Sequence, residues 1–185
     1  MLFCYIFAMW FIVSQVAGGI ALVLSAISYF ASNKKYYLFF QIAMNIFYAL
    51  SFIVINALVA GIDTIVFIFL TIIVYFYEKN SKKTPIIFLI LFSAFYIIIG
   101  IVFLQDYLEI IPICTSIIFT AVIWIKEMQT LRYFLLIPNI MLVIYGIACG
   151  VYTTALLDFL DTIMLVLAIV TWHLKNRGLK NKDLL

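Results

Sequence analysis

The chain has 185 residues, of which 68% are hydrophobic and only 10% are charged, and its mean hydropathy is +1.27. So few polar residues cannot cover a soluble domain of this size, which excludes that class. The net charge is +3, and membrane orientation accounts for the basic residues better than nucleic-acid binding does. We therefore expect an all-α polytopic membrane protein whose partner is the lipid bilayer, and the composition leaves a homo-oligomer open.

The eleven lysines and arginines fall into four short clusters, separated by stretches without positive charge. Residues 1–33 suffice for one membrane span, and 36–78, 84–125 and 133–174 each suffice for two. This predicts seven transmembrane helices with all four clusters on one face. Basic residues mark the cytoplasmic face, so we expect the N-terminus outside and the C-terminus in the cytoplasm. The clusters are Lys34 and Lys35; Lys79, Lys82 and Lys83; Lys126 and Arg132; and Lys175, Arg177, Lys180 and Lys182.

Taken in chain order, the apolar stretches predict spans at 9–31, 36–55, 58–77, 85–104, 109–125, 132–149 and 154–173. The first apolar run is too long for one perpendicular helix, so either this helix tilts or translation starts at Met9. Span 85–104 is almost entirely apolar and is interpreted as a linker helix. The single membrane domain then consists of a first three-helix unit (1–78), the linker, a second three-helix unit (109–174) and a basic cytoplasmic tail (175–185).

Two short matches relate the three-helix units. Segment 35–40 (KYYLFF) recurs 97 residues later at 132–137 (RYFLLI), and 63–65 (DTI) recurs 98 residues later at 161–163. Because one helix separates the units, both have the same orientation, and we predict a parallel repeat about an axis along the membrane normal. Such repeats place a substrate path between the units, near mid-membrane.

Polar side chains follow one face of the third and seventh spans at helical spacing. An ionised carboxylate in hydrocarbon costs about 2.5–3.5 kcal/mol on insertion, so these faces should point into the bundle or a wet cavity. One interpretation is a paired-carboxylate site for a cation, a proton or a polar solute. The other is structural hydrogen bonding between helices near the outer interface. The residues are Asn56, Ala60, Asp63 and Thr64 on the third span, and Thr154, Asp158, Asp161 and Thr162 on the seventh.

Amide and phenol side chains on the second and sixth spans extend this candidate path. They are Gln41, Asn45 and Tyr48, and Asn139 and Tyr145. Each could instead tie helices together, and for Gln41 we expect that structural role.

The fifth and first spans carry further signals. Pro112 opens the fifth span and is expected to leave a kink that exposes backbone carbonyls. Small residues every fourth position in the first span, at Ala17, Ala21 and Ser25, indicate close helix packing.

The sequence contains no metal-ligand cluster, nucleophile elbow, phosphate-binding loop or two-histidine zinc motif. An enzyme is therefore disfavoured, and neither a cofactor nor a metal is indicated. Trp124, Tyr133 and Trp172 lie near the cytoplasmic boundary, where aromatic residues anchor helices. His173 is the only histidine and adjoins Lys175 at that boundary, which indicates a surface position.

Several segments resemble the YgjV-like bacterial inner membrane proteins, and the likeness covers most of the chain from Met9 onward. These segments are 14–18 (SQVAG), 33–35 (NKK), 109–112 (EIIP) and 143–150 (VIYGIACG). That family looks related to the PQ-loop group, which includes SWEET-type sugar carriers, PnuC-type vitamin-precursor carriers and lumenal cargo receptors. The resemblance implies a bacterial inner-membrane location and a three-plus-one-plus-three helix plan with a solute path between the units.

Two features depart from the PQ-loop group. SWEET-type carriers use an asparagine pair on the third and seventh helices, where the nearest equivalents here are Asp63 and Asp161. The proline-glutamine dipeptide that names the group is absent, since Gln15 and Pro112 each stand alone. The acids make a sugar less fitting and favour a cationic or proton-coupled solute.

These observations lead to two hypotheses about function. The first is a transmembrane transporter of a small polar or cationic solute, working by alternating access between the two three-helix units. The alternative is a non-transporting membrane receptor or assembly partner that acts through its cytoplasmic basic face.

Overall fold

The computed structural model describes the backbone of residues 2–54, 58–103, 107–150 and 152–182, without the side chains at 2–8, 11, 58–60, 103, 109, 153–154 and 176–182. Every described element is helical, which confirms the all-α fold class for this part of the chain. The elements are α1 (Leu2–Phe30), α2 (Lys34–Val54), α3 (Leu58–Lys79), α4 (Ile86–Phe103), the short 3₁₀ helix η1 (Tyr107–Glu109), α5 (Ile110–Val122), α6 (Met128–Ala148) and α7 (Tyr152–Lys182).

Within the described residues, five helices are long and apolar enough to cross a membrane: α1, α2, α3, α6 and α7. The other two, α4 and α5, are shorter apolar helices. α5 has 13 residues and is about 20 Å long, less than the roughly 30 Å of a bilayer core. Tighter turns continue it, since Trp124 N donates to Ala121 O (3.2 Å) and Ile125 N donates to Val122 O (2.9 Å).

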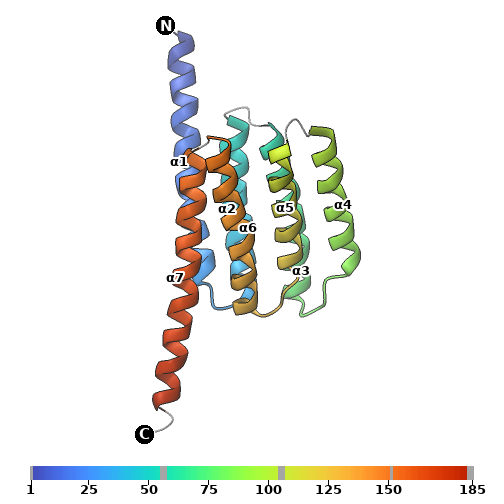
Figure 1. Cartoon of the computed structure of the whole chain (residues 1–185), viewed down its shortest axis with the longest axis vertical. Helices are drawn as coiled ribbons and strands as arrows, with labels where there is room; N and C mark the ends of the chain where they lie inside the picture. The colour runs from blue at the N-terminus through green and yellow to red at the C-terminus, as the bar shows by residue number, and fades with distance from the viewer. Residues whose placement is uncertain (1, 55–57, 104–106, 151, 183–185) are drawn as a thin grey trace.

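The seven helices stand side by side and form two groups (Figure 1). We call α1, α2 and α3 the first triplet and α5, α6 and α7 the second triplet; within each, the middle helix packs on both neighbours. The triplets meet along two edges. α1 packs on α7, and α3 meets α5, where the Phe67 and Phe119 ring centroids are 6.3 Å apart. α4 lies at the far edge of the bundle and packs mainly on α5.

The start of α6 differs from the sequence prediction. We expected the sixth span to begin at residue 132, but the helix begins at Met128. Glu127 has extended backbone angles (φ −77°, ψ 121°), and its carboxylate accepts a 2.6 Å hydrogen bond from Thr130 Oγ1. The segment is polar because it lies at the end of the bundle, and its Met, Gln, Leu and Arg are all good helix formers.

The helix bounds of the two triplets coincide at a separation of 94 residues. α2 and α6 both have 21 residues, starting at Lys34 and Met128, and α3 starts at Leu58 where α7 starts at Tyr152. Six of the seven buried residues of α2 have a buried counterpart in α6 at this separation. The pairs are Lys34 and Met128, Tyr37 and Leu131, Leu38 and Arg132, Gln41 and Leu135, Met44 and Pro138, and Asn45 and Asn139.

Contacts between neighbouring helices coincide at the same separation. A Cβ added to Gly61 of α3 would lie 3.8 Å from the Cβ of Phe52 on α2. At the corresponding place in the second triplet, a Cβ added to Gly146 of α6 would lie 2.9 Å from the Cβ of Ala155 on α7. In the first triplet the middle helix contributes the large residue, Phe52, and in the second it contributes the small one, Gly146. The contact itself occupies the same place in both triplets.

The separations of 97 and 98 residues taken from the sequence matches do not produce this correspondence. They pair Asp63 with Asp161, whereas the helix bounds pair Asp63 with Leu157 and Thr64 with Asp158. The sequence matches therefore lie about one helical turn from the structural correspondence. Short segments rich in aromatic and aliphatic residues recur easily in an apolar chain, so their likeness does not define the register.

The main buried cluster lies toward one end of the bundle. We call this the basic end, because the turns at 31–33, 80–85 and 125–127 and the lysines beside them lie there. Large apolar side chains from six helices of both triplets meet in this cluster. They are Tyr29, Tyr37, Leu38, Leu70, Val74, Val122, Ile123, Met128, Leu131, Leu135, Leu165, Ala168 and Ile169.

Candidate functional site

Asp161 joins the two triplets where α1 meets α7. Its Oδ1 accepts a hydrogen bond of 2.8 Å from the Oγ of Ser25, which is fully buried on α1. Asp161 is half-buried on the face of α7 that turns toward the bundle. This position agrees with the expectation that an intramembrane carboxylate avoids lipid.

Hydrogen bonds continue from this serine into α2. Ser28 Oγ donates to the carbonyl oxygen of Ser25 (2.7 Å), and Gln41 Nε2 donates to Ser28 Oγ (3.0 Å). Asn45 Nδ2 in turn donates to the carbonyl oxygen of Gln41 (2.7 Å). Gln41 thus ties α2 to α1, the role expected for it from sequence, and the polar side chains form a continuous line from α7 to the middle of α2.

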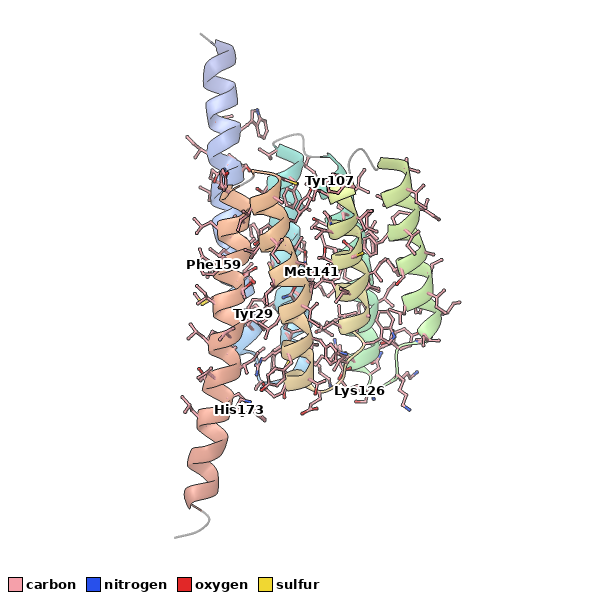
Figure 2. The ribbon with its side chains drawn as sticks, viewed as in Figure 1. Tyr29, Tyr107, Lys126, Met141, Phe159 and His173 are labelled. Carbon is pink, nitrogen blue, oxygen red and sulfur yellow. The ribbon has the colours of Figure 1, made fainter. Side chains whose placement is uncertain are left out.

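Two tyrosines border this line. The Tyr29 hydroxyl lies near the side chains of Ser25, Asn139 and Asp161. In Figure 2, Tyr29 lies in projection between the ribbons of α6 and α7, nearer to the basic end than Met141 and Phe159. Tyr48 of α2 is half-buried and lies within electrostatic range of Asp161, Asp158 and Tyr29. The site thus draws on α1, α2, α6 and α7.

Asn45 and Asn139 occupy equivalent places in the two triplets, each the twelfth residue of its helix. Both are buried, with exposed fractions of 7% and 5%. Their environments differ, because Asn45 Nδ2 donates to the Gln41 carbonyl, whereas Asn139 Nδ2 lies near the Tyr29 hydroxyl but completes no hydrogen bond among the described residues. Pro138, inside α6, also lacks the N–H that would bond to the carbonyl of Phe134. The second triplet therefore has a buried amide nitrogen that makes no hydrogen bond among the described residues.

Asp63 belongs to a separate place, the edge where α3 meets α5. Its Oδ2 accepts a long hydrogen bond of 3.4 Å from Ser116 Oγ, and Tyr96 of α4 lies within its electrostatic range. No interaction between described residues joins Asp63 to Asp161. In the described structure the Asp63 and Asp161 carboxylates therefore do not form a pair. Each acid instead accepts a serine hydroxyl from the opposite triplet.

The remaining candidates on α7, α3 and α6 have different surroundings. Asp158 is half-buried and lies near Asp161. The two acids that lie close together are therefore both on α7. Thr162 Oγ1 donates to the carbonyl oxygen of Asp158 (2.8 Å) within α7. Thr64 and Tyr145 are half-buried, and both interact with neighbouring groups. Asn56 lies outside the described residues, and Ala60 and Thr154 lie outside the described side chains.

We expected Pro112 to kink its helix. In the structure this residue is the third of α5, in the first turn, where a proline fits without a kink. A first-turn N–H has no partner within a helix, so the missing donor costs nothing there. The carbonyl of Pro112 accepts a 2.7 Å hydrogen bond from Thr115 Oγ1. The proline inside a helix near the site is instead Pro138.

Among the described residues, the intramembrane acids have no basic partner. Within the described residues the one ion pair joins Lys34 and Glu78 at the basic end, with 3.9 Å between Nζ and Oε2. The same residues contain no group of three or more histidine, cysteine or acidic side chains close enough to hold a metal ion. The polar groups described at the site are carboxylates, hydroxyls and amides.

Two site residues escaped the sequence analysis. Ser25 was interpreted only as a small packing residue, and Tyr29 is one of many aromatic residues in an apolar chain. The sequence signal for both is their spacing, since Ser25, Ser28 and Tyr29 share a helix face at i, i+3 and i+4.

A second set of contacts joins the triplets at the basic end. Arg132 of α6 is buried and donates a 2.8 Å hydrogen bond to the carbonyl oxygen of Ala31, just after α1. With the Gln129 amide turned so that its oxygen faces them, that oxygen accepts hydrogen bonds from Arg132 and from the Trp172 indole (3.2 Å). His173 is exposed and shares a hydrogen bond with Tyr133.

Comparison with known proteins places the chain in a family. The model of the Imp-YgjV family, described as a bacterial inner membrane protein, matches residues 12–176. No curated protein and no solved structure matches the chain. The matched residues include all the described residues of the candidate site. The chain therefore belongs to the Imp-YgjV family of bacterial inner membrane proteins.

Proposed function

We propose that this multi-pass inner membrane protein transports a small polar or cationic solute, by alternating access between its two triplets. The observation that carries the proposal is the half-buried Asp161 carboxylate, which is hydrogen-bonded across the triplet boundary and has no basic partner among the described residues. Intramembrane acids of this kind mark ion and solute pathways. A negative group without a fixed counter-charge suits a cation, a proton or an amine.

The groups around Asp161 support recognition of a polar solute. The Tyr29 hydroxyl lies near Asp161 and near the buried Asn139 amide, whose nitrogen makes no hydrogen bond among the described residues. A buried polar group without a partner is costly, so a ligand that accepts a hydrogen bond from it gains that energy. Carboxylate, phenol and amide together can bind a solute that carries both a donor cation and an acceptor.

The coincidence of the triplets at 94 residues supports a parallel repeat, with the site at the interface between its halves. In such carriers one half rocks against the other around a central site. Here the large apolar cluster lies between Asp161 and the basic end, where it would close that exit. Toward the other end, each triplet packs internally through small residues, namely Ser14, Ala17, Ala49, Gly61, Gly146 and Ala155.

We take the basic end to be cytoplasmic, because lysine and arginine concentrate on that face of membrane proteins. With the apolar cluster closed, this structure then corresponds to a state shut toward the cytoplasm. The N-terminus lies at the opposite end of the bundle and the C-terminus beyond the basic end (Figure 1).

The test is flux in proteoliposomes, recorded as charge movement after concentration jumps of inorganic cations, small amines and amino acids. We expect at least one class to give a signal that Asp161→Asn abolishes. Glu127→Gln is the matched control, since it also removes one negative charge but lies exposed at the basic end. Equal signals from Asp161→Asn and wild type, or no signal across the panel for wild type, would contradict the proposal.

One observation favours the alternative of a receptor or assembly partner. α7 continues to Lys182, beyond its span of Ala155–Lys175, and this extension projects from the basic end (Figure 1). A projecting helix can dock onto another protein. If so, removal of residues 176–185 abolishes the cellular phenotype of the gene, while Asp161→Asn leaves that phenotype intact.

A further inference from the structure

Two hollows of opposite character meet at the basic end, and Ser32 lines both. The first, of about 410 Å³, is polar and charged, and we call it the lysine pocket. Its lining combines the α1–α2 turn and the end of α3 with the segment between α5 and α6. The lining residues are Ser32, Asn33, Lys34, Lys35, Glu78, Lys126 and Met128.

The lysine pocket carries an excess of positive charge. Three lysines, Lys34, Lys35 and Lys126, line the pocket together with one acidic residue, Glu78, whose carboxylate lies 3.9 Å from the Lys34 ammonium group. Lys126 lies within electrostatic range of Lys34, which is only 7% exposed. Lys34 and Lys35 also open α2, where the helix dipole is positive and disfavours cations. An anion in this pocket relieves all of these repulsions.

The second hollow is an apolar groove of about 500 Å³ between α1 and α2 on the outer surface of the bundle. It is lined by Ala26, Ile27, Phe30, Ala31, Ser32, Tyr36 and Phe40. Phe30 and Tyr36 are strongly exposed, as expected of side chains that face lipid. Because the groove runs along the last turn of α1 and the start of α2 to the turn at Ser32, it ends where the lysine pocket begins.

From this arrangement we propose that the protein binds one anionic phospholipid at the basic end, with its phosphate in the lysine pocket and an acyl chain in the apolar groove. Basic pockets between transmembrane helices are suited to such headgroups. A free phosphate uses the lysines but leaves the groove unused, so the groove favours the lipid as the source of the phosphate.

The pocket also joins the triplets, since Lys34 and Lys35 belong to the first and Lys126 and Met128 border the second. A phosphate held by lysines of both sides adds a contact at the basic end, beside the hydrogen bond from Arg132 to Ala31. The lipid therefore stabilises the arrangement in which this end is closed.

The experiment uses the full-length protein purified in detergent. Native mass spectrometry counts retained lipid, and thermal unfolding is followed while phosphatidylglycerol or phosphatidylcholine is added. We expect one phosphatidylglycerol per chain and a higher Tm, which phosphatidylcholine does not reproduce. Lys35→Gln with Lys126→Gln should weaken retention roughly 30-fold, because each lysine near a headgroup contributes about a fivefold factor.

The control removes the same charge elsewhere at the basic end, with Lys82→Gln and Lys83→Gln, two exposed residues outside the pocket. Equal loss of lipid in this control would reduce the effect to general surface charge and overturn the proposal. Glycerol phosphate is the second control, since a rise in Tm equal to that given by phosphatidylglycerol would assign the pocket to a soluble anion. A third variant, Ala26→Phe, fills the groove and should lower lipid retention while all the lysines remain.

Discussion

The Oγ of Ser25 donates a 2.8 Å hydrogen bond to the Oδ1 of Asp161, and the two residues lie 136 positions apart in the first and last helices. This bond spans the boundary at which the triplets would separate in an alternating-access cycle. It is also the first of the hydrogen bonds that continue to Gln41 and Asn45 in α2. A solute that takes the Asp161 carboxylate from Ser25 therefore also weakens the link between the triplets.

Replacing Ser25 by alanine should lower the free energy of unfolding by about 1 kcal/mol, the usual range for a hydrogen bond between membrane helices. The unfolding midpoint in a mild-detergent and SDS titration measures this loss. Ser93→Ala on α4 serves as control, because Ser93 takes part in none of the described side-chain hydrogen bonds. A Ser25→Ala protein as stable as the control would show that the bond contributes nothing.

The equivalent asparagines should respond differently to the same change. Asn45→Leu breaks the bond to the Gln41 carbonyl and should cost about 1 kcal/mol of stability, whereas Asn139→Leu removes a nitrogen without a described partner and should cost less. In the flux assay we expect the larger loss from Asn139→Leu, since the Asn139 nitrogen makes no hydrogen bond among the described residues and can donate to a solute. Loss of flux in Asn45→Leu alone would place recognition on the first triplet.

Gly146→Ala should destabilise the contact between α6 and α7. The new Cβ would lie 2.9 Å from the Cβ and 3.1 Å from the Cα of Ala155, and backbone atoms cannot rotate away. Overpacking of this kind costs about 1–3 kcal/mol. Gly19→Ala is the control, with no atom within 4 Å of the added Cβ. Adding Ala155→Gly to Gly146→Ala should recover part of the lost stability. An equal fall in Tm for Gly146→Ala and for the control Gly19→Ala would refute the contact.

Arg132→Met should loosen the basic end, because it removes the hydrogen bond to the Ala31 carbonyl while keeping an apolar stem in the core. We measure this as maleimide labelling of Leu135→Cys, with Cys4, Cys114 and Cys149 replaced by serine. Leu135 is only 3% exposed, so its labelling should rise several-fold when the end opens. Tyr133→Phe breaks only the exposed bond to His173 and should leave labelling unchanged. Unchanged labelling in Arg132→Met would mean that the apolar cluster alone closes this end.

The number and approximate positions of the helices could be predicted because charge and length constrain a chain in lipid so strongly. A lysine cannot stay in hydrocarbon, so the gaps between Lys35, Lys79 and Lys126 limited the number of helices. Seven helices occur within the described residues, near the predicted spans. The start of α6 was missed because Gln129 and Thr130 are polar, and polarity at a membrane boundary does not separate helix from turn.

The pairing of residues across helices could not be predicted in the same way. In a soluble helix the apolar face marks the core, but here lipid and core are both apolar, so burial leaves little trace in the sequence. Leu38 is fully buried while the neighbouring Phe39 is 54% exposed, and both are large hydrophobic residues. For this reason the sequence matches at 97 and 98 residues missed the correspondence at 94.

The sequence by itself determined that this is a multi-helix membrane protein, which ends of the helices are basic, and that Asp63, Asp158 and Asp161 must avoid lipid. These properties follow from the energy of each residue in hydrocarbon, which does not depend on its neighbours. Only the tertiary structure decided that Asp161 meets Ser25 while Asp63 meets Ser116 at a separate edge. That choice depends on how helices pack and in which register, and small residues such as Gly146 decide it through the close approach they allow.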